Sequence, residues 1–282
     1  MGELASLNNI PSLLITHGSH VPPKNEFEMM GWKEHSLGLM DTHYGYIAVQ
    51  SPWAMEYLKK IPTDSIQIIT GPLLFSRVNG SKKSKQLIQK LVPNAGNKII
   101  LLHADTPRQR IDFRFYVYQT VDEYISSLNS LISSIKRIKD LYLIIRFRPK
   151  PYLSEEDLKS LLIEGDCYSI HTEGTFDEYL SIADMLISYS STTIEEALQN
   201  KVPVLLYDRQ GKYCHIPCQT IEPSTRPEIS SCYYVNSEDN LQRAFAWLVE
   251  NHFSKGIPDS IWTRHLFQED EKVDLAAYFI NK

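Results

Sequence analysis

The stretch 182–198, IADMLISYSSTTIEEAL, decides the fold class of this chain. It begins with a short apolar run that has the length of a buried strand, and it ends with the spacing of a helix. Between them lies a turn of four consecutive hydroxyl residues, Ser190 to Thr193. A turn that ends a parallel strand and opens a helix leaves backbone N–H groups free at the carboxyl edge of the sheet, where open α/β sheets bind ligands. We therefore predict a strand, turn and helix unit of a parallel sheet.

Strand-sized apolar runs recur along the chain and alternate with helical patterns. They cover residues 12–16, 46–50, 66–70, 98–103, 141–146, 185–189 and 202–207. Helix start signals, in which a hydroxyl residue is followed three positions later by an acidic one, occur at Thr120, Ser154 and Thr175. This alternation predicts the α/β class with a doubly wound, Rossmann-like parallel sheet.

The patterns divide the chain into four parts. Residues 1–75 hold three predicted strands, too few for a complete domain, and are expected to be the last part of an N-terminal Rossmann-like domain. Residues 76–97 are expected to connect it to a second Rossmann-like domain at 98–255, and residues 256–282 to form helices that pack back toward the first part. On this interpretation the chain is a fragment or a short form of a two-domain protein.

The composition is that of a globular protein. Of the 282 residues, 43% are hydrophobic and 22% are charged, and the net charge is −5, so the field of the whole molecule does not favour nucleic acid. No apolar run approaches the roughly 18 residues of a membrane-spanning helix. The four cysteines are too few and too unevenly spaced for a disulfide framework. These observations predict a cytoplasmic protein without a nucleic-acid partner, in which any anion site is local.

The hydroxyl-rich turn allows two interpretations. In the first, Ser190, Ser191 and Thr192 hold a phosphate together with the N-terminus of the following helix. In the second, the turn only caps that helix, with a capping box formed by Thr192 or Thr193 and the glutamate three positions later. Four hydroxyl residues in a row exceed what one cap requires, so we favour phosphate binding.

Arginines follow two other predicted strands. Arg146 and Arg148 lie at the end of the run 141–146 and share a strand face, and Arg108 follows the run 98–103. Guanidinium groups suit phosphate oxygens, so these side chains are expected to bind phosphate at the same sheet edge. The alternative is a solvated basic strand end and an ordinary polar loop.

Two histidines also follow predicted strands. His17, with Gly18 after it, is a candidate general base, although a lone histidine is more often structural. His215 follows the run 202–207 and could contact a ligand. It lies between Cys214 and Cys218, but no second pair of ligands stands at zinc-site spacing, so we predict no metal site.

Four segments, in order, resemble GT-B glycosyltransferases of bacterial surface and capsular polysaccharide synthesis, including CDP-glycerol glycerophosphotransferase-like and CMP-sugar transferase-like enzymes. They are IPSLLITHG at 10–18, IITGP at 68–72, ILLHADTPR at 100–108 and IADMLISYSS at 182–191. Two positions differ from the family pattern. Arg148 precedes Pro149 where histidine is common, and Ser188 stands where an acidic residue is expected.

The resemblance implies a metal-independent, inverting glycosyltransferase, or its donor-binding part, without a cofactor. It implies a nucleotide-sugar donor, CMP- or CDP-linked in preference to UDP-linked, a glycan or lipid-linked acceptor, and peripheral association with the inner membrane face. His17 would then be the catalytic base, and Thr106, Glu195 and Glu196 would contact the ribose or base. The alternatives are a CDP-glycerol or ribitol phosphotransferase, a UDP-sugar 2-epimerase, and a non-catalytic nucleotide-binding module.

Overall fold

The computed structural model describes residues 1–16, 22–31, 43–61, 63–75, 84–107 and 117–280. The chain forms two compact units. Most of the first consists of Met1–Phe75 and Asp259–Lys282, and most of the second of Ser76–Gln109 and Val117–Pro258. His17, Gly18 and Arg108, three of the predicted site residues, lie outside the described residues.

The first unit contains a three-stranded parallel sheet. Its strands are β1 (Leu13–Leu14), β2 (Tyr46–Val49) and β3 (Ile66–Ile69), in that order. Helix α3 (Pro52–Leu58) begins at Ser51, whose hydroxyl accepts a hydrogen bond from the Ala54 N–H at 3.1 Å. Helix α1 (Gly2–Leu7) precedes the sheet.

The end of the chain completes this unit. The Val273 N–H donates to the carbonyl of Ile69 at 2.8 Å, and helix α12 (Leu275–Ile280) places Tyr278 edge-on against Tyr46. Phe267 joins the buried cluster of β2 and α3. Helix α11 (Asp259–Trp262) and a 3-10 turn at Glu269–Glu271 lie along this segment.

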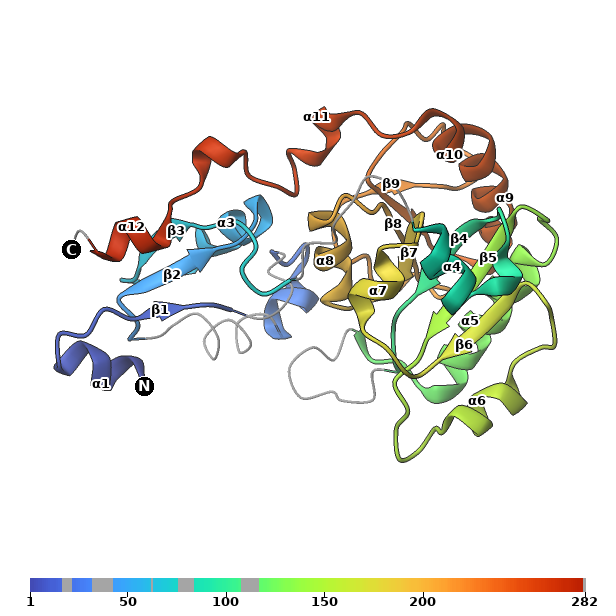
Figure 1. Ribbon diagram of the computed structural model, residues 1–282, viewed down its shortest axis with the longest axis horizontal. Helices are drawn as coiled ribbons and strands as arrows, with labels where there is room; N and C mark the ends of the chain where they lie inside the picture. Colours follow the sequence, from blue (N-terminus) through green and yellow to red (C-terminus); the bar gives the residue numbers. More distant parts are fainter. Residues whose placement is uncertain (17–21, 32–42, 62, 76–83, 108–116, 281–282) are drawn as a thin grey trace. The chain divides into compact units, whose positions relative to one another are not determined.

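The second unit is a doubly wound parallel sheet of seven strands (Figure 1). Its order is β6-β5-β4-β7-β8-β10-β9. The strands are β4 (Ile99–His103), β5 (Leu141–Arg146), β6 (Tyr168–His171), β7 (Met185–Ser188), β8 (Val204–Tyr207), β9 (Gln219–Thr220) and β10 (Cys232–Val235). Strands β4 and β7 are neighbours at the point where the order reverses, the switch point at which open α/β sheets bind ligands.

Helices connect these strands. They are α4 (Lys85–Leu91), α5 (Val121–Ile135), α6 (Glu155–Leu161), α7 (Phe176–Leu180), α8 (Thr193–Gln199) and α9 (Glu238–Trp247), followed by a π-helical turn at Leu248–His252 and α10 (Phe253–Lys255). Buried leucines of α5 and α9 join one core cluster with strand residues such as Leu143 and Leu205. This continuous core explains why the central strands are unbroken apolar runs in the amino-acid sequence.

All seven predicted strands are confirmed, and β6, β9 and β10 are additional. The predicted capping boxes at Thr120 and Ser154 are formed. The segment 76–97, expected to be a connection, contains α4 and a 3-10 turn at Pro93–Ala95 and belongs to the second unit.

Candidate functional site

The site lies at the carboxyl ends of β4 and β7, in the second unit. Asp105 and Thr106 follow β4, and the hydroxyl-rich turn follows β7. Because the two strands are hydrogen-bonded neighbours, with His103 opposite Ile187, the segments that leave them meet at one edge of the sheet. The arrangement therefore puts the predicted turn at the switch point.

The carboxylate of Asp105 holds the turn in place. Its Oδ2 atom accepts a hydrogen bond from the hydroxyl of Ser188 at 3.2 Å, and from the backbone N–H groups of Tyr189 and Ser190 at 2.8 and 3.1 Å. Its Oδ1 atom accepts the N–H of Thr106 at 2.8 Å. Asp105 is buried, and these donors compensate for the desolvation of its charge.

Asp105 also interacts with a residue of helix α5 and with the last residue of β4. The Tyr124 hydroxyl donates to the backbone carbonyl of Asp105 at 3.2 Å. Burial lowers the pKa of His103 to about 4, although the negative charge of Asp105 opposes the shift. His103 is therefore neutral near pH 7. A cavity of about 10 Å³ lies among these side chains, enough for at most one water molecule, so it cannot be the substrate site.

The turn caps helix α8 differently from either predicted box. The Thr193 N–H donates to the Ser191 hydroxyl at 3.3 Å, and the Thr193 hydroxyl donates to the Ala104 carbonyl at 3.3 Å. Thr192, the N-cap residue, makes no side-chain cap hydrogen bond. The helix is thus capped by Ser191 rather than by Thr192 or Thr193 with a glutamate.

The members of the turn differ in accessibility. Ser190 is 0% exposed and its N–H is bonded to Asp105, whereas Ser191 and Thr192 are partly exposed. Within the described chain, the backbone N–H groups of Ser191 and Thr192 have no hydrogen-bond acceptor. Of the three turn residues predicted to bind phosphate, Ser191 and Thr192 are therefore the two that are partly exposed.

Two glutamates lie on the first turn of α8. Glu195 and Glu196 are both partly buried. Burial, assisted by the negative charge of Asp177, raises the pKa of Glu196 to about 7. Glu196 can therefore change its protonation state near neutral pH, and in either state it can hydrogen-bond a hydroxyl group.

Arg146, the last residue of β5, and Arg148, two positions further along the chain, have different surroundings. Arg146 donates to the backbone carbonyls of Phe147 and His171 at 3.1 and 3.2 Å, and to that of Gly174 at 2.7 Å. Its guanidinium also lies 5.7 Å from the ring centroid of Tyr179. Arg146 thus fixes the segment between β6 and α7.

Arg148 is exposed and makes no hydrogen bond or ion pair with the part of the chain that the structure describes. The phosphate role predicted for both arginines stays a prediction. Of the two, Arg148 is the one whose guanidinium has no partner among the described residues.

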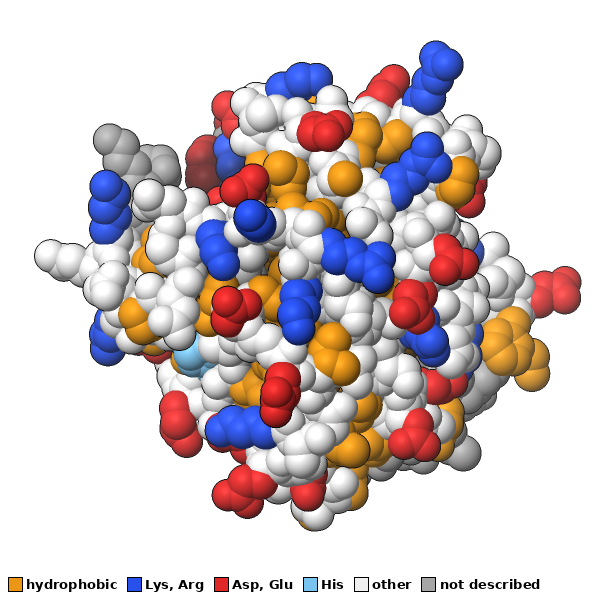
Figure 2. Space-filling view, turned by 90° about the vertical axis from the view of Figure 1, so that its right-hand side faces the viewer, with side chains coloured by type: hydrophobic (Ala, Val, Ile, Leu, Met, Phe, Trp, Pro, Cys, Tyr) orange, Lys and Arg blue, Asp and Glu red, His pale blue; other side chains and the backbone are white. Residues whose placement is uncertain are grey.

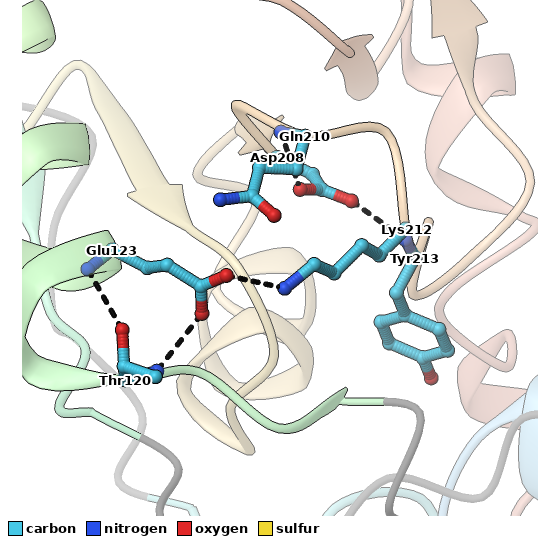
Figure 3. Close-up of polar contacts among 6 residues, drawn as sticks. All are labelled: Thr120, Glu123, Asp208, Gln210, Lys212 and Tyr213. Atoms are coloured by element: carbon cyan, nitrogen blue, oxygen red, sulfur yellow. Dashed lines mark hydrogen bonds and ion pairs between the residues drawn. The ribbon is translucent and has the colours of Figure 1, made fainter.

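The loop after β8 adds a polar network to this edge (Figure 3). Asp208 accepts the N–H groups of Gln210 at 3.0 Å and Tyr213 at 2.6 Å, which folds the loop back on itself. Burial raises the pKa of Asp208, and these backbone donors oppose the shift. Lys212 forms an ion pair with Glu123 at 2.6 Å, which joins the loop to the first turn of α5.

Glu123 has two roles in Figure 3. It closes the capping box with Thr120, whose N–H it accepts at 2.9 Å, while it pairs with Lys212. Burial would raise the pKa of Glu123, but the hydrogen bonds from Lys212 and Thr120 prevail and lower it. The carboxylate is therefore kept charged at this edge of the sheet.

The same loop contacts Tyr189, the residue that precedes the hydroxyl-rich turn. The ring of Tyr213 packs edge-on against the ring of Tyr189, with centroids 6.2 Å apart. The Tyr213 hydroxyl lies 3.1 Å from Nδ1 of His215, which is 1% exposed. His215 is thus buried behind Tyr213, and its contact with a ligand stays a prediction.

Sequence reasoning missed Asp105 as the organising residue of the site. The available signal was an acidic residue directly after a buried strand, but its significance depends on β4 and β7 being neighbours. It likewise missed Asp208 and Lys212, which follow β8 at the same edge. Among the described residues, no group of three or more His, Cys, Asp or Glu side chains is placed to hold a metal ion.

The surface carries no dominant charge on the face drawn in Figure 2, where basic and acidic side chains are interspersed. None of the helices in the described ranges has both the length and the apolarity needed to span a membrane. A second pocket, of about 230 Å³, is lined by residues of the β9 to α9 region and shares none with the turn.

Comparison with known proteins shows the fold. No protein-family model matches the chain, and no curated protein sequence matches it. Among solved structures, S. aureus MnaA in complex with UDP is similar, with 14% identity and a TM-score of 0.57, covering 94% of this chain and 65% of that one.

Two further structures are similar to the same degree. UDP-GlcNAc 2-epimerase from Neisseria meningitidis, bound to UDP-GlcNAc, has 16% identity and a TM-score of 0.57, covering 99% of this chain and 71% of that one. A putative UDP-N-acetylglucosamine 2-epimerase from Listeria monocytogenes has 14% identity and a TM-score of 0.55, covering 94% and 72%. The chain thus spans about two thirds of the length of these proteins. The predicted α/β fold, with Rossmann-like parallel sheets of the GT-B type, is confirmed.

Proposed function

We propose that this chain binds a nucleotide-activated sugar at the switch point of the second unit and acts on it as an enzyme of the GT-B type. The observation that carries the proposal is the pair of partly exposed residues Ser191 and Thr192 at the carboxyl edge between β4 and β7, whose backbone N–H groups have no acceptor within the described chain. Such donors at a switch point suit a phosphate.

The neighbouring side chains suit the rest of a nucleotide sugar. Arg148, exposed at the end of β5, supplies a positive charge for a diphosphate. Glu195 and Glu196 on α8 offer acceptors for ribose hydroxyls, and Thr106 is predicted to contact the ribose or the base. His17 and Arg108 keep their predicted roles as acid–base and phosphate-binding residues.

In the proposed reaction, sugar transfer breaks the bond between the anomeric carbon and the diphosphate. A general base removes the proton of the attacking acceptor hydroxyl, and negative charge grows on the leaving phosphate. The donors of the turn and Arg148 would stabilise that charge, and such stabilisation is commonly the largest part of catalysis. The acceptor, a surface glycan or lipid-linked sugar, is the part of the proposal that rests on the sequence resemblance alone.

The comparisons bear on which nucleotide the site binds. The sequence resemblance favours cytidine, but the two similar structures with named ligands hold UDP and UDP-GlcNAc. These ligands support UDP as the first nucleotide to test, and nothing in the comparisons favours CMP or CDP.

A second candidate is epimerisation of a UDP-sugar at C2. It is favoured by the names of two of the similar structures, both given as UDP-GlcNAc 2-epimerases, one of them putative. This reaction shares the nucleotide site with a transferase but needs no acceptor.

A nucleotide panel followed by product analysis separates these functions. A thermal-shift assay with UDP, CMP, CDP and GDP should show the largest stabilisation with UDP, because a ligand that binds only the folded state raises its stability. Incubation with UDP-GlcNAc alone, followed by chromatography, then distinguishes the two enzymes. An epimerase converts UDP-GlcNAc by itself, whereas a transferase transfers the sugar only when an acceptor is present.

Two other results have a defined meaning. Turnover of CDP-glycerol or CDP-ribitol would indicate the phosphotransferase alternative, and binding without turnover of any donor would indicate a nucleotide-binding module. If none of the nucleotides raises the melting temperature, the proposed site is wrong.

A further inference from the structure

Two cysteines lie together in the loop between β8 and β9. The Sγ atoms of Cys214 and Cys218 are 3.4 Å apart, and both thiols are placed to donate to the carbonyl of Ile216 at 3.0 Å. Both side chains are partly exposed, whereas Cys167 and Cys232 are buried. The loop thus presents two thiols in contact at a position that a small reagent can reach.

We propose that Cys214 and Cys218 form a reversible disulfide and that this modification controls the adjacent ligand site. A disulfide needs a separation of about 2.05 Å between the sulfurs, so they must approach by a further 1.4 Å or so. Each sulfur must then leave the Ile216 carbonyl, because the thiol proton that it donates is lost. The backbone between residues 214 and 218 rearranges accordingly.

The chemistry uses a low-molecular-weight disulfide such as oxidised glutathione. The thiolate of one cysteine attacks the glutathione disulfide, forms a mixed disulfide and releases one glutathione thiolate. The second cysteine, as its thiolate, attacks the protein sulfur of the mixed disulfide and releases the second glutathione thiolate. The two cysteines lose two electrons and two protons in total, and the oxidised glutathione becomes two molecules of reduced glutathione.

Two tyrosines connect this loop to the candidate site. Cys214 directly follows Tyr213, whose N–H donates to Asp208 at 2.6 Å and whose ring packs against Tyr189. Tyr189 in turn precedes Ser190 and donates its N–H to Asp105. We therefore expect a rearrangement at Cys214 to displace Tyr213 and, through their ring contact, Tyr189, which precedes the turn. The effect on ligand binding rests on the proposed function, but the formation of the disulfide does not.

The first measurement concerns the disulfide alone. The full-length protein is equilibrated with mixtures of oxidised and reduced glutathione, and free thiols are then blocked by alkylation. Cleavage after acidic residues, with no cut before proline, gives a peptide 209–228 that contains Cys214 and Cys218 but neither of the other two cysteines. We expect this peptide to become lighter by two hydrogen atoms and to resist alkylation in oxidising mixtures, and to be alkylated twice after addition of dithiothreitol.

Matched variants sharpen this test. Cys218→Ser should lose the two-hydrogen change, whereas Cys232→Ser, which alters a buried cysteine, should keep it. Alkylation of both Cys214 and Cys218 after equilibration with oxidised glutathione, or a bond from either to another cysteine, would overturn the proposal.

The second measurement concerns binding of UDP. We expect oxidation to weaken UDP binding to the wild-type protein by roughly tenfold, the change produced by the loss of about one hydrogen bond, and to leave binding to Cys218→Ser unchanged. Equal UDP affinity of the oxidised and reduced protein would refute control of the site while the mass data still report the disulfide. Absence of UDP binding in the reduced protein would instead refute the proposed function.

Discussion

The Oδ2 atom of Asp105 accepts the backbone N–H of Ser190 at 3.1 Å, across the switch point between β4 and β7. This hydrogen bond holds a carboxylate against the first residue of the turn. The same turn is predicted to bind phosphate. Two negative groups close together in a buried environment repel each other. A bound phosphate is therefore expected beyond Ser190, at Ser191 and Thr192, with the positive charge of Arg148 to balance it.

Replacement of Asp105 should destabilise the protein. Asp105→Ala removes the acceptor for four donors, which are the Ser188 hydroxyl and three backbone N–H groups, including that of Ser190 at the start of the turn. We expect the free energy of unfolding, measured by urea denaturation, to fall by about 3 kcal/mol. Asp166→Ala, at an exposed position, should change it by less than about 0.5 kcal/mol. Equal effects of the two substitutions would show that Asp105 does not organise the turn.

Substitutions of Arg146, the last residue of β5, and of Arg148, two positions later, should separate effects on stability from effects on binding. Arg146→Ala removes hydrogen bonds to three backbone carbonyls and should lower the free energy of unfolding by about 1 to 2 kcal/mol, allowing for its partial exposure. Arg148→Ala should leave the melting temperature unchanged but weaken UDP binding, measured by calorimetry, by roughly tenfold. Lys150→Ala is the control on the same segment. If it weakens UDP binding as much as Arg148→Ala does, the basic strand end is only solvated.

His103 should make folding sensitive to acid. Its pKa in the folded protein is lowered to about 4 because burial disfavours the charged ring. Between about pH 4 and 6.5 the unfolded state therefore binds a proton that the folded state does not, so this contribution to stability is present above pH 6.5 and is lost as the pH falls toward 4. In His103→Gln, the slope of unfolding free energy against pH should decrease by about 1.4 kcal/mol per pH unit in this range. An unchanged slope in His103→Gln would contradict this prediction.

Among the predicted strands, four of the second unit are buried along almost their whole length. Strands β4, β5, β7 and β8 are continuous apolar runs in the sequence, because helices cover the parallel sheet on both sides. Strand β6 was missed because its residues are all half-buried and two of its four, Ser169 and His171, are polar. Strand β9 has only two residues and no pattern of its own, whereas β10, with the sequence CYYV, carried a strand signal that could have been used.

The candidate site could be predicted in position but not in detail. The sequence pattern placed the hydroxyl turn at the end of a strand, which the structure confirms. The link to Asp105 joins residues 85 positions apart, and it follows from the pairing of β4 with β7, which periodicity does not reveal. Alternation correctly put Arg146 near the sheet edge, but its acceptors at His171 and Gly174 depend on β6, which was not predicted.

Glu196 should reduce stability as the pH rises. Its pKa in the folded protein is raised to about 7, because burial and Asp177 disfavour the charged carboxylate. Between about pH 4.5 and 7 the folded state therefore binds more protons than the unfolded state, and the free energy of unfolding falls as the pH increases. Glu196→Gln should be more stable than the wild type at pH 8 by about 1 kcal/mol, after allowance for partial exposure. A wild-type protein as stable as Glu196→Gln at pH 8 would contradict this.

The turn itself can be tested by two neighbouring threonines that make different contacts. Thr193 donates its hydroxyl to the Ala104 carbonyl and its N–H to Ser191, so Thr193→Ala should lower the free energy of unfolding by about 1 kcal/mol and leave UDP affinity unchanged. Thr192 is partly exposed and its side chain makes no cap hydrogen bond, so Thr192→Ala should keep the melting temperature. If its hydroxyl binds the nucleotide phosphate, the same substitution should cost about 1.5 to 3 kcal/mol of binding, roughly ten- to a hundredfold in affinity by calorimetry. Unchanged UDP affinity in both variants would show that these two hydroxyls serve only the helix cap and do not bind the nucleotide.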